Sequence, residues 1–563
     1  MRRPLIALIL VYTIATLGLT LIPGIDPEGN PWRMSIFHAF YFVSFMGSTI
    51  GFGELPYPFT DPQRYWVLGC IYVSVVAWLY TIGTMLSLIQ DASFKQAVIH
   101  QQFSRNIAKL KEPFYILCGY GDTGRILTSE LTGLGFTVIV LDKDQDSLLD
   151  IDLTDFPAPV YSLNGDITVP ETLISAGITN RCCRAVIALT SHDHTNLKVA
   201  VSTKALNPNL LTVCRAEEAE EIANLRSFNT DVIINPNEIF ANRLLAAMQN
   251  PPAEAISQWL ISQQRHELQV TEEAIVNNVP TSGPWIICGY GKFGRALKET
   301  LDTHQIEAIV IEQSCNHEQL PDGTIEGNGT EAKTLEQANI YKAKGLIAGT
   351  NDDANNLSIL LTARDMNNKL FTIGRLNEQH NQPLYSSAKP EMTLRYSHLM
   401  ADTILTRLTR PLVTRFLREI PKLSKQRTSE LYQSIAALTT GGHLTTWRIP
   451  VTEQRAPAVW EALSNQNTVK LQHLLTRPDH QNSANNRQQA LCLLVKRANH
   501  YELMPDGDIE LQLNDELLFC GLKRESNHTE WLSQNIELLE NTILGQRHHI
   551  PLLRWWNRRQ KVT

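Results

Sequence analysis

The sequence lacks the spacings that mark metal-bound or disulfide-linked residues. Its nine cysteines form no repeated Cys-x-x-Cys pair, and its histidines show no metal-ligand spacing. The adjacent Cys182 and Cys183 cannot easily bridge each other. No helix carries a repeat of arginines, which excludes a voltage sensor of the usual kind. We expect buried thiols in a reducing compartment at four cysteines that fall in predicted strands, Cys118, Cys214, Cys288 and Cys520.

Charged residues are also missing from two long stretches near the N-terminus, residues 5–22 and 65–90. At about 1.5 Å per residue, the first gives roughly 27 Å of helix, which is close to the hydrocarbon thickness of a bilayer. The second is long enough to cross with a tilt. Arg2 and Arg3 also fit the start of a signal peptide, but the apolar run is long and has no clear cleavage site. We therefore predict two transmembrane helices.

Basic residues set the predicted orientation of these helices. Arg2 and Arg3 precede the first helix and four basic residues follow the second within residues 95–111, whereas the loop between carries only Arg33 and Arg64. Because such residues stay on the cytoplasmic side, both termini are predicted to be cytoplasmic in a multi-pass inner (plasma) membrane protein. The outer loop contains four acidic residues, so its mouth favours cations.

An aromatic-rich segment, residues 35–46, lies between the two helices and is too short to span. The glycine-containing residues 48–54 follow it. Non-helical backbone at membrane depth is stable only where it is buried or lines a water path. We predict a re-entrant helix followed by a segment whose main-chain carbonyls and Thr49 hydroxyl replace the water around K⁺. Glycine tolerates the backbone angles that this arrangement needs.

This segment resembles the potassium-channel filter, usually Thr-Val-Gly-Tyr-Gly-Asp. The departures are Ile50, Phe52 and Glu54. The resemblance implies K⁺ as the permeant ion and a homotetramer, since one chain supplies a quarter of each carbonyl ring. Phe52 lacks the hydroxyl that would tie the filter to its support, which leaves the degree of K⁺/Na⁺ selectivity open. The alternative is a glycine-rich loop outside a two-helix anchor. The predicted filter residues are Thr49, Ile50, Gly51, Phe52 and Gly53.

The second apolar helix contains Gly83 and leads into a polar linker, residues 91–112. Two explanations of Gly83 stay open, a gating hinge and close packing between helices. We expect the linker to continue the helix.

A dinucleotide-binding fingerprint follows the linker. The apolar run 114–118 precedes Gly119-Tyr120-Gly121-Asp122-Thr123-Gly124, a helical pattern begins at Arg125, and the next predicted strand ends at Asp142. The glycines allow a tight turn, phosphate approach and close helix packing, and the helix N-terminus offers N–H groups to phosphate. Asp142 is placed to bind ribose hydroxyls and to repel a 2′-phosphate. NAD or ADP-type ligands are therefore favoured over NADP.

The fingerprint recurs at Gly289-Tyr290-Gly291-Lys292-Phe293-Gly294, followed by Arg295 and, after the next strand, by Glu312. Residues 185–190 also match residues 345–350. Two fingerprints with aligned downstream segments predict tandem βα domains. The second copy has Lys292 where the first has Asp122, and Asn328 where the first has Asp166. It is therefore expected to prefer another nucleotide or to be empty.

The two folds resemble RCK domains (regulators of K⁺ conductance, related to TrkA-N) over residues 113–250 and 283–400. With the pore, the whole chain is similar to prokaryotic two-transmembrane potassium channels with tandem RCK domains, of the MthK and GsuK type. The resemblance implies a ligand-gated channel with a cytoplasmic ring of eight RCK domains. The implied fold class is a membrane α-helical pore (two transmembrane helices plus a re-entrant pore helix), tandem α/β Rossmann-like RCK domains and a small α+β RCK-C domain.

Carried over to this sequence, the resemblance implies two nucleotide sites and allows Ca²⁺ at domain interfaces. A solvated helix face is the favoured explanation of the acidic residues 217–221. No nucleic-acid partner is expected. The first site is Gly119, Tyr120, Gly121, Asp122, Thr123, Gly124, Arg125 and Asp142, with Asp166 near the base. The second site is Gly289, Tyr290, Gly291, Lys292, Phe293, Gly294, Arg295 and Glu312.

Short strands are predicted at residues 444–451, 490–496 and 516–520, and Asn514-Asp515-Glu516-Leu517 resembles the Gly-Asp-x-Leu pattern of RCK-C (TrkA-C) domains. Residues 244–266 instead look like a helix pair. The Trp- and Arg-rich residues 554–559 are expected to be disordered or to pack on a neighbour, with membrane contact as the alternative. The predicted domains are 1–90 (pore), 91–112 (linker), 113–282 (first RCK-N), 283–425 (second RCK-N) and 426–563 (RCK-C-like).

Two other functions are considered. A regulatory NAD-binding subunit of a K⁺ transporter has the same nucleotide fold but no pore of its own, which the apolar stretches argue against. A membrane-anchored NAD-dependent oxidoreductase needs a proton donor beside the nicotinamide, and the sequence shows no motif for one. We therefore expect a channel and not an enzyme.

Overall fold

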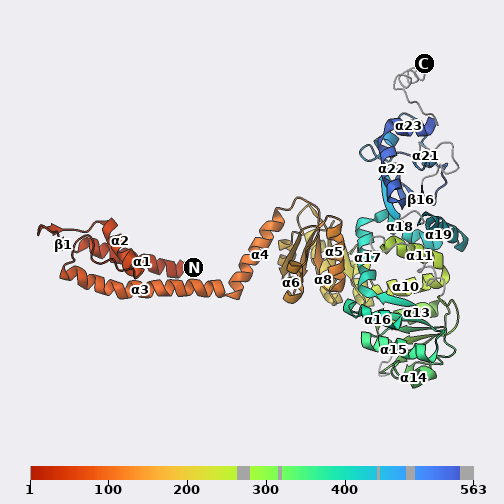
Figure 1. The fold of residues 1–563 in the computed structure, drawn as a ribbon, viewed down its shortest axis with the longest axis horizontal. Coiled ribbons are helices and arrows are strands. Elements are labelled where there is room, and N and C mark those ends of the chain that lie inside the picture. Colours follow the sequence, from red (N-terminus) through yellow and green to blue (C-terminus); the bar gives the residue numbers. More distant parts are fainter. Residues whose placement is uncertain (1, 263–278, 315–319, 440–443, 477–488, 545–563) are drawn as a thin grey trace, which may run out of the picture. The chain divides into compact units, whose positions relative to one another are not determined.

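The computed structural model describes residues 2–262, 279–314, 320–439, 444–476 and 489–544 (Figure 1). Contacts divide the chain into two compact units, residues 1–109 and residues 110–563. The first unit is mainly helical. The second contains two six-stranded sheets and one four-stranded sheet.

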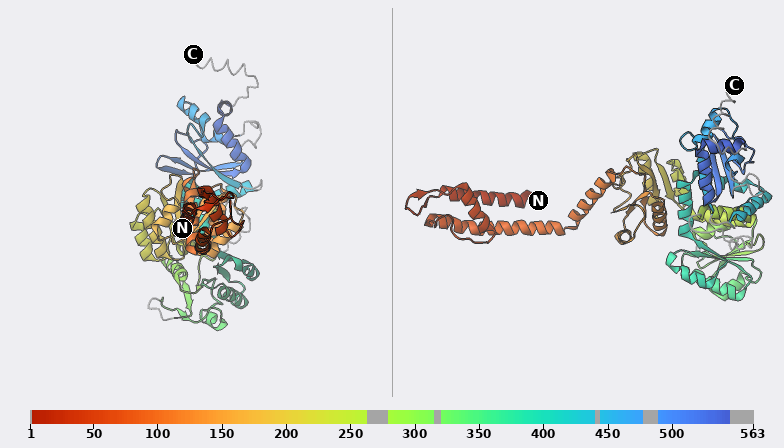
Figure 2. Two further views of the ribbon diagram at one scale, coloured as in Figure 1. Left: turned by 90° about the vertical axis from the view of Figure 1, so that its left-hand side faces the viewer. Right: turned by 45° about the horizontal axis from the view of Figure 1, so that its top comes forward.

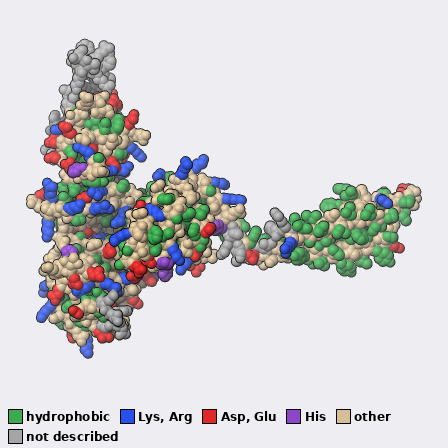
Figure 3. Space-filling model, turned by 180° about the vertical axis from the view of Figure 1, so that it is seen from behind, with side chains coloured by type: hydrophobic (Ala, Val, Ile, Leu, Met, Phe, Trp, Pro, Cys, Tyr) green, Lys and Arg blue, Asp and Glu red, His purple; other side chains and the backbone are tan. Residues whose placement is uncertain are grey.

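Two helices of the first unit are long and apolar enough to cross a membrane, Arg3–Leu21 within α1 and Asp61–Ser87 within α3. Figure 3 shows hydrophobic side chains over most of the visible surface of this unit. Length and composition alone support membrane insertion, which stays a prediction. The elements are α1 (Arg2–Leu21), β1 (Gly24–Ile25), β2 (Pro31–Trp32), α2 (Ile36–Gly47), α3 (Asp61–Gln90) and α4 (Ala92–Ala108).

Small residues let α1 pack closely on α2 and α3. A Cβ atom added at Gly47 would lie 2.2 Å from the Tyr12 hydroxyl oxygen, and one at Gly18 would lie 2.1 Å from the Trp66 ring. Trp66 Nε1 also donates a hydrogen bond to the Ala15 carbonyl oxygen at 3.2 Å. Glycines thus make room for the aromatic side chains that join these helices.

The structure confirms the short helix predicted at residues 35–46, but the linker at residues 91–112 differs from the expectation. α2 begins after Ser35, whose hydroxyl oxygen accepts the N–H of His38, so the helix has its expected start. The expected continuation of the second long helix is wrong. α3 ends at Gln90, and Asp91 Oδ1 accepts the N–H of Phe94 at 2.9 Å. This cap starts α4 as a separate helix.

The first large sheet is parallel and has the strand order β5-β4-β3-β6-β7-β8. Its central strands are apolar and buried, as expected for a sheet covered on both faces. The strand order reverses between β3 and β6, which is where open α/β sheets bind ligands. The strands are β3 (Phe114–Cys118), β4 (Thr137–Asp142), β5 (Val160–Asn164), β6 (Cys183–Ala188), β7 (Leu211–Arg215) and β8 (Val232–Ile234), and the helices are α5 (Asp122–Gly133), α6 (Gln145–Leu153), α7 (Pro170–Ser175), α8 (Asp193–Leu206) and α9 (Ala219–Ser227).

The second large sheet repeats this parallel topology in the order β11-β10-β9-β12-β13-β14. The predicted pair of Rossmann-like folds is therefore confirmed. The strands are β9 (Trp285–Cys288), β10 (Ala308–Glu312), β11 (Ile325–Glu326), β12 (Gly345–Ala348), β13 (Phe371–Leu376) and β14 (Met392–Arg395), and the helices are α13 (Lys292–Thr303), α14 (Ala332–Gln337), α15 (Asp353–Met366), η1 (Gln379–Asn381) and α16 (Gln382–Ala388).

The last helix of each half covers the sheet of the other half. Ile404 and Leu405 of α17 (Tyr396–Thr409) belong to the buried core of the first sheet, and α17 packs on α5. Phe240 and Leu244 of α10 (Pro236–Gln249) belong to the core of the second sheet, and α10 packs on α13. Each half thus completes the hydrophobic core of the other. α11 (Pro251–Ser262) follows α10 and confirms the predicted helix pair.

An antiparallel sheet near the C-terminus has the order β15-β18-β16-β17 (Figure 2). The three predicted strands are confirmed as β15 (Leu444–Pro450), β16 (Ala490–Arg497) and β18 (Glu516–Leu522), and β17 (His500–Leu503) is additional. Asn514 has a φ of +69°, which explains why it can replace the usual glycine. The helices here are α18 (Pro411–Glu419), η2 (Ile420–Lys422), α19 (Lys425–Thr439), α20 (Pro457–Ser464), α21 (Leu471–Leu474), α22 (Lys523–Gln534) and α23 (Ile536–Leu544).

The Trp- and Arg-rich residues 554–559 lie outside the described residues. The boundaries of the predicted domains within residues 110–563 stay a prediction.

Candidate nucleotide site and candidate pore

The first glycine loop connects β3 to α5. Gly119 has a φ of +102°, a left-handed conformation that glycine adopts at little cost. A Cβ atom at Gly124 would lie 2.5 Å from the Gly119 carbonyl oxygen, so only glycine lets α5 approach the turn this closely. No side chain of the described residues caps α5 at Gly121. The N–H groups of its first turn are therefore available to an anion.

Asp142 ends β4 and holds this loop in place. Its Oδ2 accepts the N–H of Tyr120 at 2.6 Å, and its Oδ1 accepts the N–H of Asp144 at 2.9 Å. The residue also lines the cavity next to the loop. Asp142 thus supports the turn, and the expected contact with ribose stays a prediction.

A cavity of about 780 Å³ opens beside the first loop. Asp166 lines it, and Oδ1 of its carboxylate accepts hydrogen bonds from the N–H and hydroxyl groups of Thr168 at 2.9 and 2.7 Å. These hydrogen bonds lower the pKa of the Asp166 carboxyl group, which favours its charged form. The predicted residues that line the cavity are Gly119, Tyr120, Gly121, Asp122, Thr123, Gly124, Asp142 and Asp166.

Arg125 is not among the residues that line this cavity. Its guanidinium group forms an ion pair with Asp150 of α6 and lies 5.3 Å from the centroid of the Tyr120 ring. The Tyr120 side chain itself is buried in the core beneath the loop. In this conformation Arg125 thus pairs with α6, and its expected role in nucleotide binding stays a prediction.

The second glycine loop keeps the turn but has a buried aromatic residue, Phe293. Glu312 Oε2 accepts the N–H of Tyr290 at 2.5 Å, as Asp142 does in the first loop. Phe293 is 2% exposed and its ring centroid lies 5.4 Å from that of Phe240. A Cβ atom at Gly349 would lie 2.9 Å from the Phe293 ring. The Phe293 side chain is thus packed into the core beside this loop, and nucleotide binding there stays a prediction.

Charged groups from both halves meet beside the first cavity. Glu217 accepts hydrogen bonds from Arg215 Nε at 3.1 Å and from the Tyr396 hydroxyl at 2.8 Å, and Lys292 Nζ lies 3.0 Å from Glu218 Oε1. Burial raises the pKa of Glu217, but the charge of Arg215 and the hydrogen bonds from Arg215 and Tyr396 outweigh it and lower the pKa overall. Glu217 is therefore a buried, ionised bridge between the halves.

This bridge corrects the expected solvated face at Glu217, whose side chain is only 12% exposed, whereas Glu218 and Glu220 are exposed as expected. No cluster of three or more His, Cys, Asp or Glu side chains suited to a metal ion occurs among the described residues. Ca²⁺ thus stays a prediction without an assigned site.

The cavity wall includes residues that are absent from the sequence prediction, among them Arg215, Arg375, Asn377 and Tyr396. Arg215 is in β7 and Arg375 is in β13, at equivalent positions of the two repeats. Extending the repeat alignment to these strands would have marked both arginines. Tyr396 gives no such signal, because it reaches this cavity through the exchange of α17.

The candidate filter alternates in backbone conformation. Thr49, Gly51 and Gly53 have φ angles of +61°, +69° and +96°, whereas Ile50 and Phe52 do not have positive φ. Alternation between left-handed and right-handed backbone conformations brings successive main-chain groups to the same side of the chain. This is the arrangement expected of a segment that presents carbonyl oxygens to one axis.

Side chains anchor the outer end of this segment. Glu54 Oε2 accepts the N–H of Phe59 at 2.8 Å, and Glu54 Oε1 lies 2.9 Å from Arg64 Nε. The Phe52 ring packs edge-on against Phe45, with centroids 5.5 Å apart. Phe52 thus contacts the short helix through apolar surface instead of a hydroxyl group.

Gly83 lies within α3, which is continuous around it. A Cβ atom added there would meet nothing within 4 Å in the described chain. Contacts inside one chain therefore do not require glycine at this position. The hinge and packing against another copy both stay open.

The described cysteines are free, and most are buried. Burial raises the pKa of Cys183, Cys214 and Cys288 to about 12. Their thiolate forms are scarce at neutral pH, which agrees with the expected role as core residues.

Residues 115–236 and 285–393 match the family model of the TrkA-N domain. Potassium channel protein 1 of Methanocaldococcus jannaschii is 27% identical over 269 residues, which cover 48% of this chain and 74% of that protein. The chain is thus similar to prokaryotic potassium channels. Its two Rossmann-like folds contain the segments that match the TrkA-N domain.

The share of each relative that the match covers varies widely. An uncharacterised protein of Methanothermus fervidus is 30% identical over 226 residues, but the match spans only 40% of this chain and 34% of that protein. A solved structure described as the GsuK channel bound to NAD has 15% identity and a TM-score of 0.45, and the match covers 94% of this chain and 97% of that one.

Proposed function

We propose that this chain is the subunit of a homotetrameric potassium channel that is gated by an adenine nucleotide. One observation carries the proposal. A filter-like segment with alternating φ angles lies between two membrane-length helices, and the same chain holds two TrkA-N domains with a nucleotide-sized cavity. The similarity to archaeal potassium channels supports it.

In this proposal, α1 and α3 cross the inner membrane with both termini in the cytoplasm. Four copies of Thr49-Ile50-Gly51-Phe52-Gly53 surround K⁺ with carbonyl oxygens. Glu54 and its ion pair with Arg64 hold the outer end of each copy.

The regulatory ligand is NAD or an ADP-type nucleotide in the first TrkA-N domain. The glycine loop and the start of α5 take phosphate, and the Asp142 carboxylate takes ribose. The second loop is the weaker candidate, because Phe293 is buried there and Lys292 pairs with Glu218.

A nucleotide gates the channel only if it binds the open and closed states with different affinities. A tenfold difference shifts the equilibrium by about 1.4 kcal/mol per site, and four first-domain sites multiply this effect. The direction of the shift is left open.

Flux through proteoliposomes tests the proposal. We expect the purified full-length protein to pass K⁺ in preference to Na⁺ and to respond to NAD or ADP, and we expect T49A and G51A to abolish the flux. Substituting Gly51 places a side chain at a φ of +69°, which costs about 1 kcal/mol or more in each of four chains. Leu384→Ala is the control, since Leu384 is exposed in α16. NADH oxidation without any K⁺ flux would overturn the channel in favour of an oxidoreductase.

A further inference from the structure

The two equivalent arginines of the TrkA-N domains have different neighbours. Arg215 forms an ion pair with Glu217, two residues later in the chain. The residue equivalent to Glu217 in the second half is Asn377, whose side chain donates a hydrogen bond to Asp353 at 2.8 Å. Arg375 has no ion pair with any residue that the structure describes. Of the two equivalent arginines, only Arg215 is thus neutralised by an ion pair.

Arg375 is held between two aromatic rings. Its guanidinium carbon lies 5.2 Å from the centroid of Phe293 and 5.1 Å from that of Tyr396. One Nη donates to Asn351 Oδ1 at 3.0 Å, and the buried Nε has no hydrogen-bond partner among the described residues. Burial lowers the pKa of this guanidinium group, and Glu217 and Asp353 offset that only from a distance. The group is fixed in place and lacks an anion.

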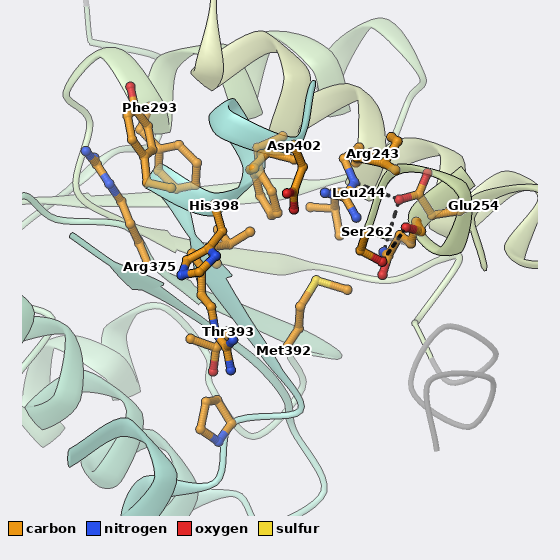
Figure 4. A pocket seen from close by; sticks show the side chains of 18 of the residues that line it. Arg243, Leu244, Glu254, Ser262, Phe293, Arg375, Met392, Thr393, His398 and Asp402 are labelled. Atoms are coloured by element: carbon orange, nitrogen blue, oxygen red, sulfur yellow. Dashed lines mark hydrogen bonds and ion pairs between the residues drawn. The ribbon is translucent and has the colours of Figure 1, made fainter. Parts of the chain in front are cut away.

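The nucleotide cavity is the place where such an anion fits. Arg375 lines the cavity of the first glycine loop and also a neighbouring pocket of about 410 Å³. Figure 4 shows its guanidinium end lying near Phe293 and away from Arg243 and Glu254 of that neighbouring pocket. Arg243 Nε and Glu254 Oε1, 2.8 Å apart, already neutralise each other. Arg375 is therefore an arginine without an ion-pair partner among the described residues, and it lines the nucleotide cavity as well as that pocket.

The cavity offers two positions for negative charge. The glycine loop and the start of α5 form one phosphate position, next to Asp142 at the ribose position. Arg375, Tyr396 and Ser397 from the second half line the same cavity, and we take the Arg375 guanidinium group as the second position. A nucleoside monophosphate needs only the first position, whereas a diphosphate extends beyond it.

We infer that Arg375, supplied by the second TrkA-N domain, binds the second phosphate of the nucleotide held by the first domain. The site then selects nucleotides with a pyrophosphate group, such as ADP and NAD, over AMP. This inference rests on the proposed nucleotide site. Because the ligand joins groups from both halves, its binding also depends on how the halves pack together.

Calorimetric titration of the full-length protein in detergent with ADP, NAD and AMP tests the inference. Arg375→Gln is expected to weaken ADP and NAD binding by about 10- to 100-fold, as for a lost charge-assisted hydrogen bond, and AMP binding by less than about twofold. Arg448→Gln is the control, because Arg448 is a half-exposed arginine of β15 that pairs with Glu516.

Asn377→Glu gives a second test that keeps Arg375 in place. It reproduces the sequence of the first half, where Glu217 neutralises Arg215 beside the equivalent Asp193. An internal carboxylate should compete with phosphate, so the preference for ADP over AMP should fall by about tenfold. This result supports the inference even if Arg375→Gln does not fold.

The outcomes separate this inference from the proposed function. If wild-type protein binds ADP and AMP equally, or if both variants keep the wild-type preference, the role of Arg375 is overturned while the nucleotide site stands. An equal loss of ADP and AMP binding in Arg375→Gln also overturns it, because that pattern reports a structural role. Wild-type protein that binds none of the three nucleotides overturns the site itself.

Discussion

Asp142 shows how one carboxylate can serve both the fold and a ligand. Its carboxylate accepts the main-chain N–H of Tyr120, in the glycine loop after β3, and that of Asp144, just after β4. Glu312 accepts the equivalent N–H in the second half, beside a loop whose Phe293 side chain is buried. Removing each carboxylate in turn therefore distinguishes a role in supporting the turn, which both share, from a role in nucleotide binding, which we propose for Asp142.

Asp142→Ala is expected to weaken ADP or NAD binding by roughly 1.5–3 kcal/mol, because hydrogen bonds to a charged group are lost. K⁺ conductance of the open channel should not change. Calorimetry measures the first effect and single-channel recording the second. Glu312→Ala is the matched control and should leave nucleotide affinity as it is. Equal affinity in Asp142→Ala and wild type would remove the first loop as the binding site.

Glu217 makes the contact between the halves sensitive to acid. Its pKa is lowered in the folded state, so its stabilisation is complete above the usual glutamate pKa of about 4.3 and is lost as pH falls through the folded value. At neutral pH, Glu217→Gln should destabilise the protein by roughly 3 kcal/mol, because Arg215 stays buried without its counter-charge.

Thermal unfolding of full-length protein between pH 7 and pH 3.5 measures this effect. The difference between wild type and Glu217→Gln should stay constant down to about pH 5 and shrink below about pH 4. Glu220→Gln, in the first turn of α9, is the control. A difference that does not depend on pH would show that Glu217 is not ionised in the folded protein.

At the scale of elements, the exchange of α10 and α17 is the main feature of the TrkA-N pair. Ile404 of α17 is fully buried in the core of the first sheet although it follows the second sheet in sequence. Ile404→Ala should destabilise the protein by about 2–5 kcal/mol through the cavity that it leaves. Thermal unfolding measures the loss, with Leu384→Ala, an exposed leucine of α16, as control. Equal stability of both variants would contradict the exchange.

The elements themselves could be predicted well from sequence, and the reason is local. Apolar runs that end at Gly119 and Gly289 fix the strands and loops, since their side chains and turn residues act within a few positions. The break at Asp91 was missed, because a single capping residue competes with a long helical pattern. The additional strand β17 was missed because its burial depends on pairing with β16.

The candidate site could be predicted only in part. Residues 119–124 and Asp142 are adjacent to strand ends, so the fingerprint places them. Arg375 and Tyr396 lie more than 200 positions further along the chain, in the second half, and reach the cavity only because the two halves pack together. The burial of Phe293 in the second loop was also beyond prediction, because it depends on Phe240 of the other half.

At the scale of the whole molecule, the proposed gating requires a change in α3, the second of the two membrane-length helices. Gly83→Ala removes a flexible point of α3 and raises helix stability by roughly 0.5–1 kcal/mol. We expect a lower open probability with unchanged single-channel conductance, measured in planar bilayers. Gly69→Ala is the control, because Gly69 also lies in α3 with open space around it. Loss of the tetramer in Gly83→Ala alone would show that this glycine serves packing.

Fusion of the two halves into one polypeptide has an evolutionary consequence. In an assembly of two identical copies, every substitution at the contact occurs twice and both faces stay the same. Here the gene encodes each face separately, so Glu217 could be kept on one side while Asn377 occupies the other. The two halves can thereby take different roles, with the proposed nucleotide site in the first half and a contact surface for it in the second.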